Sequence, residues 1–133
     1  MKYLVLLYQD ETIWSSLDDA ERNDYMEAHM AFDRAVSEGA ATMLGGEALS
    51  ETDTATTLRH DDDDRLVLTD GPFAETTEQL GGYYLVEAAD LDVMTTIAQE
   101  LPHGYTVEIR PVVDMGPVVD EVPAARSDSP AGA

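Results

Sequence analysis

The sequence predicts an α+β fold, and three observations predict it. The chain has 133 residues, the usual size of one domain, and its 44% hydrophobic and 26% charged residues are typical of a globular protein. Segments with strand periodicity alternate with segments whose apolar residues recur every three or four positions. Their order is strand, helix, strands, helix, strand, which is a ferredoxin-like plan with an extra β-hairpin inserted in its middle.

The first strand and the first helix follow one another at the N-terminus. Residues 2–8 are apolar toward both alternating faces, which is typical of a strand in the middle of a sheet that is covered on both sides. Residues 18–38 begin with an acidic turn and then carry apolar side chains at helical spacing. We therefore expect a helix over 18–38 that ends at Gly39.

The rest of the chain supplies the remaining elements and a tail. The expected elements are a strand within 41–49, a hairpin of 54–60 and 65–69 joined by four aspartates, a strand over 81–87, a helix over 90–101 and a last strand over 107–112. Residues 116–133 are rich in Pro, Ala, Ser and Asp and have no periodicity. We therefore expect a domain over 1–115 and an extended, mobile C-terminal tail over 116–133.

Two helices cover only one face of such a sheet. The strand over 2–8 is apolar toward the other face as well, so that face needs an apolar partner. A second copy of the chain can supply it. The sequence thus predicts a homodimer in which the two sheets pack face to face.

Composition excludes several classes of function. The formal net charge is −21 and Lys2 is the single lysine, which argues against direct binding of nucleic acid. The chain has no cysteine, and its longest apolar run is far too short to span a membrane, so we expect a cytoplasmic protein. No nucleotide-binding glycine loop is present, and the aspartates beside His60 offer no preorganised cage. We expect neither a cofactor nor a metal site.

One long motif resembles a known family. Residues 70–87 read Asp-Gly-Pro-Phe-Ala-Glu-Thr-Thr-Glu-Gln-Leu-Gly-Gly-Tyr-Tyr-Leu-Val-Glu, which is similar to the signature of the YCII-related family in its DGPF-domain branch. The resemblance extends to residues 1–8, 28–32, 45–49, 54–57 and 108–112. It implies a dimeric α/β-barrel fold. It also implies a link, for some members, to extracytoplasmic-function sigma factors.

The resemblance further implies a candidate acid/base residue. In the wider family a histidine on the first helix pairs with an aspartate in a proposed acid/base dyad, and one member is a dehydrochlorinase that acts on a chlorinated hydroxyquinol. His29 matches that histidine. The aspartate has no clear counterpart in residues 100–104, which read Glu-Leu-Pro-His-Gly.

The residues themselves also favour His29 as a site. It lies in the apolar stripe of the first helix and faces the sheet, where Asp70, Glu47 or a tyrosine of the strand over 81–87 can reach it. A carboxylate beside an imidazole fixes its tautomer and stabilises its charged form, as acid/base catalysis requires. We name His29 and Asp70 as the catalytic candidates. A core histidine and a turn-forming aspartate are the structural alternatives.

Four further residues are candidates for ligand binding. Glu47 follows two glycines that allow a close approach, and Glu75 lies within the long motif. Tyr83 is adjacent to a second tyrosine that points to the opposite face, and Arg110 can clamp an anion or form an internal ion pair. Two functions stay open: a cofactor-free enzyme that acts on a small molecule, or a non-catalytic ligand-binding or regulatory module of a sigma-factor system.

Overall fold

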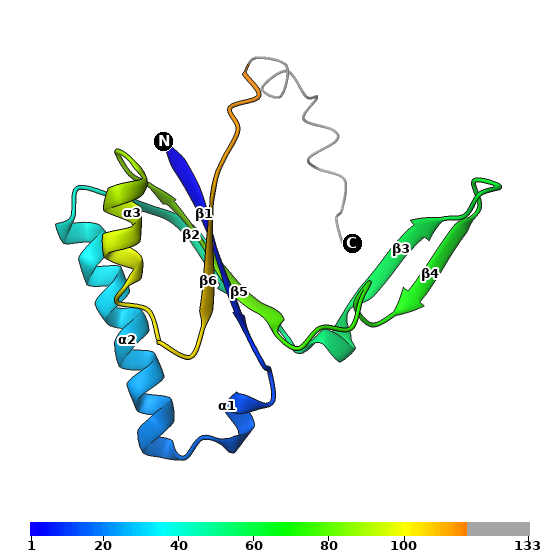
Figure 1. The fold of residues 1–133 in the computed structure, drawn as a ribbon, viewed down its shortest axis with the longest axis horizontal. Coiled ribbons are helices and arrows are strands. Elements are labelled where there is room, and N and C mark those ends of the chain that lie inside the picture. Colours follow the sequence, from blue (N-terminus) through cyan, green and yellow to red (C-terminus); the bar gives the residue numbers. More distant parts are fainter. Residues whose placement is uncertain (117–133) are drawn as a thin grey trace.

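The computed structural model describes residues 1–116, which form an α+β fold (Figure 1). The main elements are strands β1 (Lys2–Gln9), β2 (Thr42–Ala48), β5 (Gln79–Glu87) and β6 (Thr106–Pro111) with helices α2 (Asp19–Glu38) and α3 (Leu91–Ala98). Two short turns, α1 (Ile13–Ser16) and η1 (Thr52–Thr54), and a separate hairpin of β3 (Thr56–His60) and β4 (Leu66–Asp70) complete this part of the chain. The predicted tail lies outside the described residues, apart from its first residue, Gly116.

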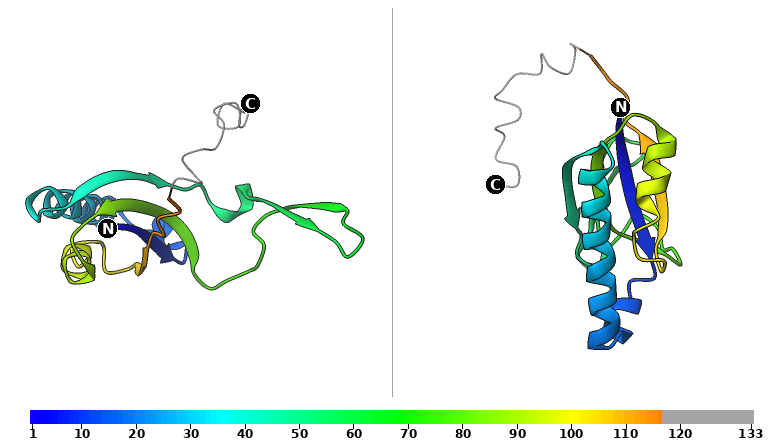
Figure 2. Two further views of the ribbon diagram at one scale, coloured as in Figure 1. Left: turned by 90° about the horizontal axis from the view of Figure 1, so that it is seen from above. Right: turned by 90° about the vertical axis from the view of Figure 1, so that its left-hand side faces the viewer.

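The four main strands form one antiparallel sheet in the order β2-β5-β1-β6. Strand β1 lies between β5 and β6, with Val5 opposite both Tyr84 and Ile109. Because directly opposed residues point to the same side of a sheet, Tyr84 faces the same way as Val5. Helices α2 and α3 both cover this side of the sheet (Figure 2).

The core lies between the sheet and the two helices. Alternate residues of β1 are buried there, and they pack with Phe32 and Val36 of α2 and with Met94 and Ile97 of α3. The opposite face of β1 carries Leu4, Leu6 and Tyr8, which are only partly buried. Strand β1 is thus apolar toward both faces of the sheet, as its sequence predicts, but within residues 1–116 helices cover only one of these faces.

Both helices start where their capping residues predict. The Asp18 carboxylate accepts a hydrogen bond from the backbone N–H of Glu21, whose side chain accepts one from the backbone N–H of Asp18. This reciprocal pair satisfies two amide groups that a helix start leaves free. Asp90 caps α3 by a single bond, in which its carboxylate accepts from the backbone N–H of Val93. The long α2 therefore begins at a defined point and presents a fixed face to the sheet.

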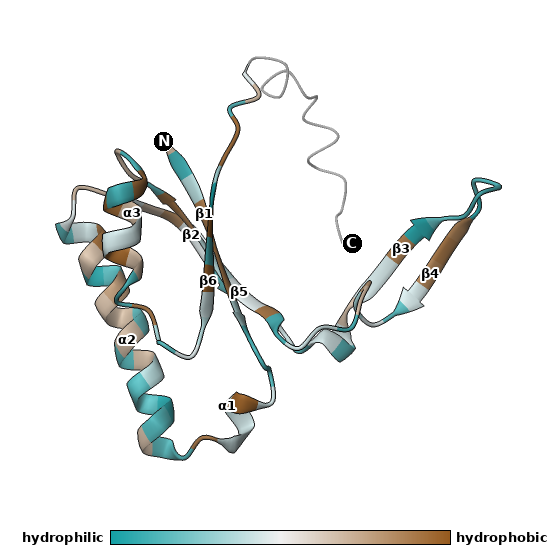
Figure 3. Ribbon diagram, viewed as in Figure 1, coloured by the Kyte–Doolittle hydropathy of each residue, from teal (hydrophilic) through white to brown (hydrophobic). Residues whose placement is uncertain are grey.

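The β3–β4 hairpin projects away from the rest of the fold (Figure 1). Leu58 lies opposite Leu68, and Leu66 shares their face of the hairpin; all three are more than half exposed. The hydropathy colouring shows this apolar stretch on β4 (Figure 3). Because these leucines are exposed, they form an apolar surface that no other part of residues 1–116 covers. An isolated two-stranded hairpin of this kind is only marginally stable in water.

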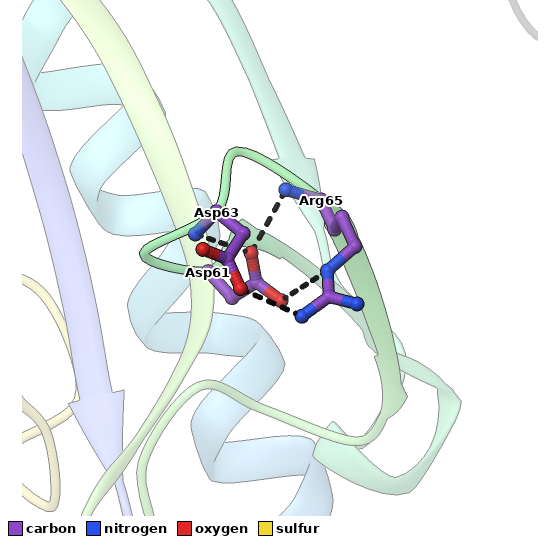
Figure 4. A network of polar contacts seen from close by, with 3 residues as sticks. All are labelled: Asp61, Asp63 and Arg65. Carbon is purple, nitrogen blue, oxygen red and sulfur yellow. Dashed lines mark hydrogen bonds and ion pairs between the residues drawn. The ribbon is translucent and has the colours of Figure 1, made fainter.

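The acidic tip of the hairpin is organised by an arginine. The Asp61 carboxylate accepts hydrogen bonds from the backbone N–H groups of Asp63 and Arg65, each with an N···O distance of 2.9 Å. Arg65 pairs with Asp61 over 3.3 Å and with Asp63 over 2.8 Å (Figure 4). These contacts reduce the repulsion between the aspartates and hold the turn. Within residues 1–116 no group of three or more His, Asp or Glu side chains is placed to hold a metal ion.

Candidate functional site

A cavity of about 520 Å³ opens between the N-terminal half of α2 and the sheet. Its walls come from β1, α1, α2, β2, β5 and the residues that precede β6. The wall is apolar and aromatic over most of its extent, and its polar groups are carboxylates, side-chain amides, hydroxyls and one imidazole. The residues that border it include Gln9, Glu11, Trp14, Tyr25, His29, Gly46, Glu47, Glu51, Tyr83, Tyr84 and Tyr105.

His29 lies in this wall between two tyrosine hydroxyl groups. Its Nδ1 is 2.7 Å from the hydroxyl of Tyr84, and its Nε2 is 3.1 Å from that of Tyr105. A neutral imidazole has one N–H and one bare nitrogen, so it donates to one tyrosine and accepts from the other. The tyrosine that receives the imidazole N–H keeps its own O–H proton. One hydroxyl is thus left to donate to a ligand.

Burial sets the charge of these three groups. It lowers the pKa of His29, and the nearby carboxylate of Asp33 opposes this shift. Burial also raises the pKa of Tyr84, with a further contribution from Asp33, and raises the pKa of Tyr105 to about 12. The imidazole and both phenols are therefore uncharged at neutral pH, and the imidazole is available as a base.

Aromatic packing fixes the positions of the two tyrosines. Phe32 packs against Tyr84 with ring centroids 4.7 Å apart. Tyr25 meets Tyr105 edge to face at 5.7 Å, and Trp14 meets Tyr25 at 6.2 Å. Such aromatic pairs stabilise the folded state by more than the burial of their surface alone, and they restrict ring rotation. The rings that line the cavity are thus held by one another.

Glycines make room for these rings. A Cβ atom at Gly46 would lie 2.6 Å from the Tyr84 ring and 2.9 Å from the backbone oxygen of Tyr83. A Cβ at Gly104 would collide with the hydroxyl of Tyr25, which hydrogen-bonds the side chain of Gln9 over 3.1 Å. The close approach expected at the Gly45-Gly46 pair therefore occurs at Gly46, where the Tyr84 ring and the backbone of Tyr83 make it, whereas a Cβ at Gly45 would meet no atom within 4 Å.

The structure brings together only part of the predicted site. His29 lines the cavity, and Glu47 and Tyr83 border it. Glu47 lies opposite Tyr83, which lies opposite Leu6, so the side chains of Glu47 and Tyr83 point to the helix-free face of the sheet. Asp70 lies at the end of β4 and is exposed, and the hydrogen-bond partners of His29 within residues 1–116 are two tyrosine hydroxyls and no carboxylate. Glu75 is exposed in the loop after β4, and Arg110 is exposed on β6, where it pairs with Glu108 over 3.3 Å. These last three residues do not line the cavity.

Sequence reasoning named Tyr84 only as a general possibility and missed three other residues of the wall. Tyr25 lies four residues before His29, and this helical spacing puts both on one face of α2. The sequence therefore did indicate that Tyr25 lies beside His29. Trp14 lies in the short α1, which has no apolar periodicity. Tyr105 precedes β6 in a turn, and nothing in its neighbours indicates a contact with His29.

These features define a small α+β protein with an aromatic cavity under its first long helix. The chain belongs to the YCII-related family, because the family model for the YCII-related domain matches residues 1–116. An uncharacterised protein of Rhizobium meliloti (strain 1021) is 40% identical over 117 residues, which covers 84% of this chain and 92% of the relative. The resemblance to the YCII-related family is thus confirmed, while the DGPF branch stays a prediction.

Proposed function

We propose that the protein binds a small molecule in this cavity and acts on it as a cofactor-free enzyme with His29 as its acid/base group. The observation that supports this proposal is the position of His29: a neutral imidazole lies in the wall of an apolar cavity with a tyrosine hydroxyl on each nitrogen. Acid/base catalysis requires a titratable group within hydrogen-bond reach of the reacting proton, directly or through one relay.

The two tyrosines give His29 such a relay. The hydroxyl that donates to the bare imidazole nitrogen passes its proton to the ring while its oxygen takes a proton from the ligand. The imidazole becomes positively charged, the tyrosine stays neutral, and the ligand is left as an anion. The second tyrosine accepts a hydrogen bond from the other ring N–H, which stabilises the positive charge, and its own O–H donates a hydrogen bond to the anionic ligand oxygen without transferring the proton. In this proposal the tyrosines take the place expected for a carboxylate, and a catalytic role for Asp70 stays a prediction.

Nuclear magnetic resonance of the three histidines tests the site. On addition of 4-ethylphenol, an uncharged aromatic alcohol, the ¹⁵N resonances of the His29 ring should shift. His60 and His103 are exposed, do not line the cavity and serve as internal controls. The unliganded protein should also give a pKa for His29 below 6.5, because burial disfavours its charged form. Equal shifts at all three histidines, or none at His29, would contradict the proposed site.

A non-catalytic binding or regulatory module is the second candidate. One observation favours it: both nitrogens of His29 already have partners within the protein, as a structural histidine requires. The cavity would then hold a ligand without changing it. The link to a sigma-factor system and the cytoplasmic location both stay predictions. Within residues 1–116 no helix is both long and apolar enough to cross a membrane.

We further propose that the domain is ferredoxin-like and assembles as a dimeric α/β barrel. The strand order β2-β5-β1-β6 supports the ferredoxin-like plan. The partly buried Leu4 and Leu6 on the helix-free face, together with the leucines of the projecting hairpin, support burial against a second copy.

Light scattering should therefore give about twice the chain mass of 14.5 kDa at micromolar concentration. Replacing Leu4 and Leu6 with aspartate should shift the protein toward the monomer, because two charges would face two charges across the two-fold axis. A wild-type protein that is monomeric under these conditions would contradict the dimer.

A further inference from the structure

We infer that the cavity selects aromatic molecules that carry a cationic amine and rejects aromatic molecules that carry a carboxylate or phosphate. This inference rests on the proposed function, which makes the cavity the ligand site, and it adds the chemical class of the ligand. It follows from the aromatic walls of the cavity, from the charges along them, and from the shape of the cavity.

Four aromatic side chains surround the space. They are Trp14, Tyr25, Tyr84 and Tyr105. Flat aromatic ligands bind well between such rings because offset and edge-to-face packing both stabilise the contact. The faces of tyrosine and tryptophan rings carry negative potential, so they also attract a cation that lies over them. The walls thus favour an aromatic ligand, and they favour a positive charge on it.

The charged residues in the wall all have the same sign. Glu11 and Glu51 line the cavity, whereas no lysine or arginine of residues 1–116 does so. Glu11 is held in place by Thr52, whose backbone N–H and hydroxyl donate to its two carboxylate oxygens over 3.0 and 2.6 Å. A fixed carboxylate at the wall loses little entropy when it binds a cation.

The basic residues of the described chain do not offset these carboxylates. The ion pairs formed within residues 1–116 are those of Arg65 at the hairpin tip and of Arg110 on β6, both outside the cavity. Arg22 is not a lining residue; it lies over the Trp14 ring at 5.3 Å and donates to the Trp14 backbone oxygen, so it covers one face of that ring and leaves the tyrosine rings to meet a cation. The ligand must therefore bring any positive charge itself.

The shape of the site strengthens this selection. Charges in a hollow with apolar walls act through less water than charges on an open surface, so their field is focused on the space between them. The net charge of the chain, −21, adds a repulsion that every anionic ligand must overcome on approach. Both effects disfavour binding of a ligand that carries a carboxylate. Both favour binding of a ligand that carries an ammonium group.

Fluorescence of Trp14 provides the test, because it is the single tryptophan and it lines the cavity. Three phenols that differ only at the far end of the side chain are titrated: tyramine, 4-ethylphenol and 3-(4-hydroxyphenyl)propionate. Tyramine should bind at least about tenfold more tightly than the propionate, with 4-ethylphenol between them. The advantage of tyramine should shrink as salt is added, since salt screens charges near the surface.

A pair of double variants separates the cavity carboxylates from the overall charge. Glu11→Gln with Glu51→Gln should reduce the preference for tyramine over the propionate by about fivefold or more. Glu38→Gln with Glu100→Gln removes the same charge from exposed positions outside the cavity and should leave the preference within about twofold of the wild type.

Three results would overturn the inference. If all three phenols bind equally, the cavity does not read charge, although the proposed binding function survives. If both double variants lose the preference to the same extent, the overall charge causes it and the cavity carboxylates do not. If none of the three changes Trp14 fluorescence, then the inference fails together with the proposed binding function.

Discussion

Replacing Phe32 with alanine is expected to lower the free energy of unfolding by about 3–5 kcal/mol. Phe32 is fully buried in α2 at the centre of the core. Its removal takes a large apolar surface out of the core and leaves a cavity that the surrounding side chains fill only in part. Because Phe32 also packs on Tyr84, the substitution should in addition loosen the tyrosine that hydrogen-bonds His29.

Thermal unfolding measures this effect, and the chain offers a matched control. A loss of this size should lower the melting temperature by about 10–20 °C for a domain of this length. The second phenylalanine of the chain, Phe73, is 75% exposed, so Phe73→Ala should change the stability by no more than about 0.5 kcal/mol. Similar losses for the two variants would mean that the core has been placed wrongly.

Replacing His29 with glutamine is expected to reduce turnover of any compound that the cavity converts by about 10²–10⁴-fold. Glutamine is of similar size and keeps one hydrogen bond to a tyrosine hydroxyl, yet it does not take up a proton. Binding of 4-ethylphenol should change far less than turnover. His60→Gln, at an exposed position on the hairpin, is the control and should retain the wild-type rate.

The pH dependence distinguishes a proton-transfer role from a structural one. As a base, His29 is active when neutral, so the rate should fall as the pH drops through its lowered pKa. Stability follows the same sign: the neutral form is favoured in the folded state, so this contribution is complete above the unfolded pKa of 6.5 and is lost as the pH falls through the folded value. His29→Gln should remove this part of the dependence.

A variant that binds 4-ethylphenol and still turns over its substrate within about tenfold of the wild type would show that His29 is not the acid/base group. A variant that unfolds earlier at every pH but binds normally would place His29 in the core.

Much of the fold could be predicted because local chemistry decides it. Asp18 and Asp90 cap their helices through their own side chains, and Gly39 ends α2, so these boundaries are encoded within a few residues of each end. The position of β1 in the centre of the sheet followed from its apolar character on both faces. The short turns α1 and η1 were not predicted, because they have no apolar periodicity that would mark them.

Less of the candidate site could be predicted, because tertiary contacts decide it. His29 was identifiable from its place on the inward face of a helix. Its partners depend on the register that puts Tyr84 opposite Val5 and on the turn that brings Tyr105 beneath α2. Asp70 was one of three candidate partners, with Glu47 and a tyrosine of β5; its strand belongs to the separate β3–β4 hairpin, and His29 hydrogen-bonds Tyr84 of β5 and Tyr105.

A crystal structure of the protein soaked with tyramine tests most directly the claim that the cavity beside His29 is the ligand site. We predict density for the ligand between α2 and β5, with its phenol oxygen within hydrogen-bond distance of the hydroxyl of Tyr84 or Tyr105 and its ammonium group toward Glu11 or Glu51. Tyramine bound elsewhere, or a cavity filled by the side chains of a second copy, would contradict the account.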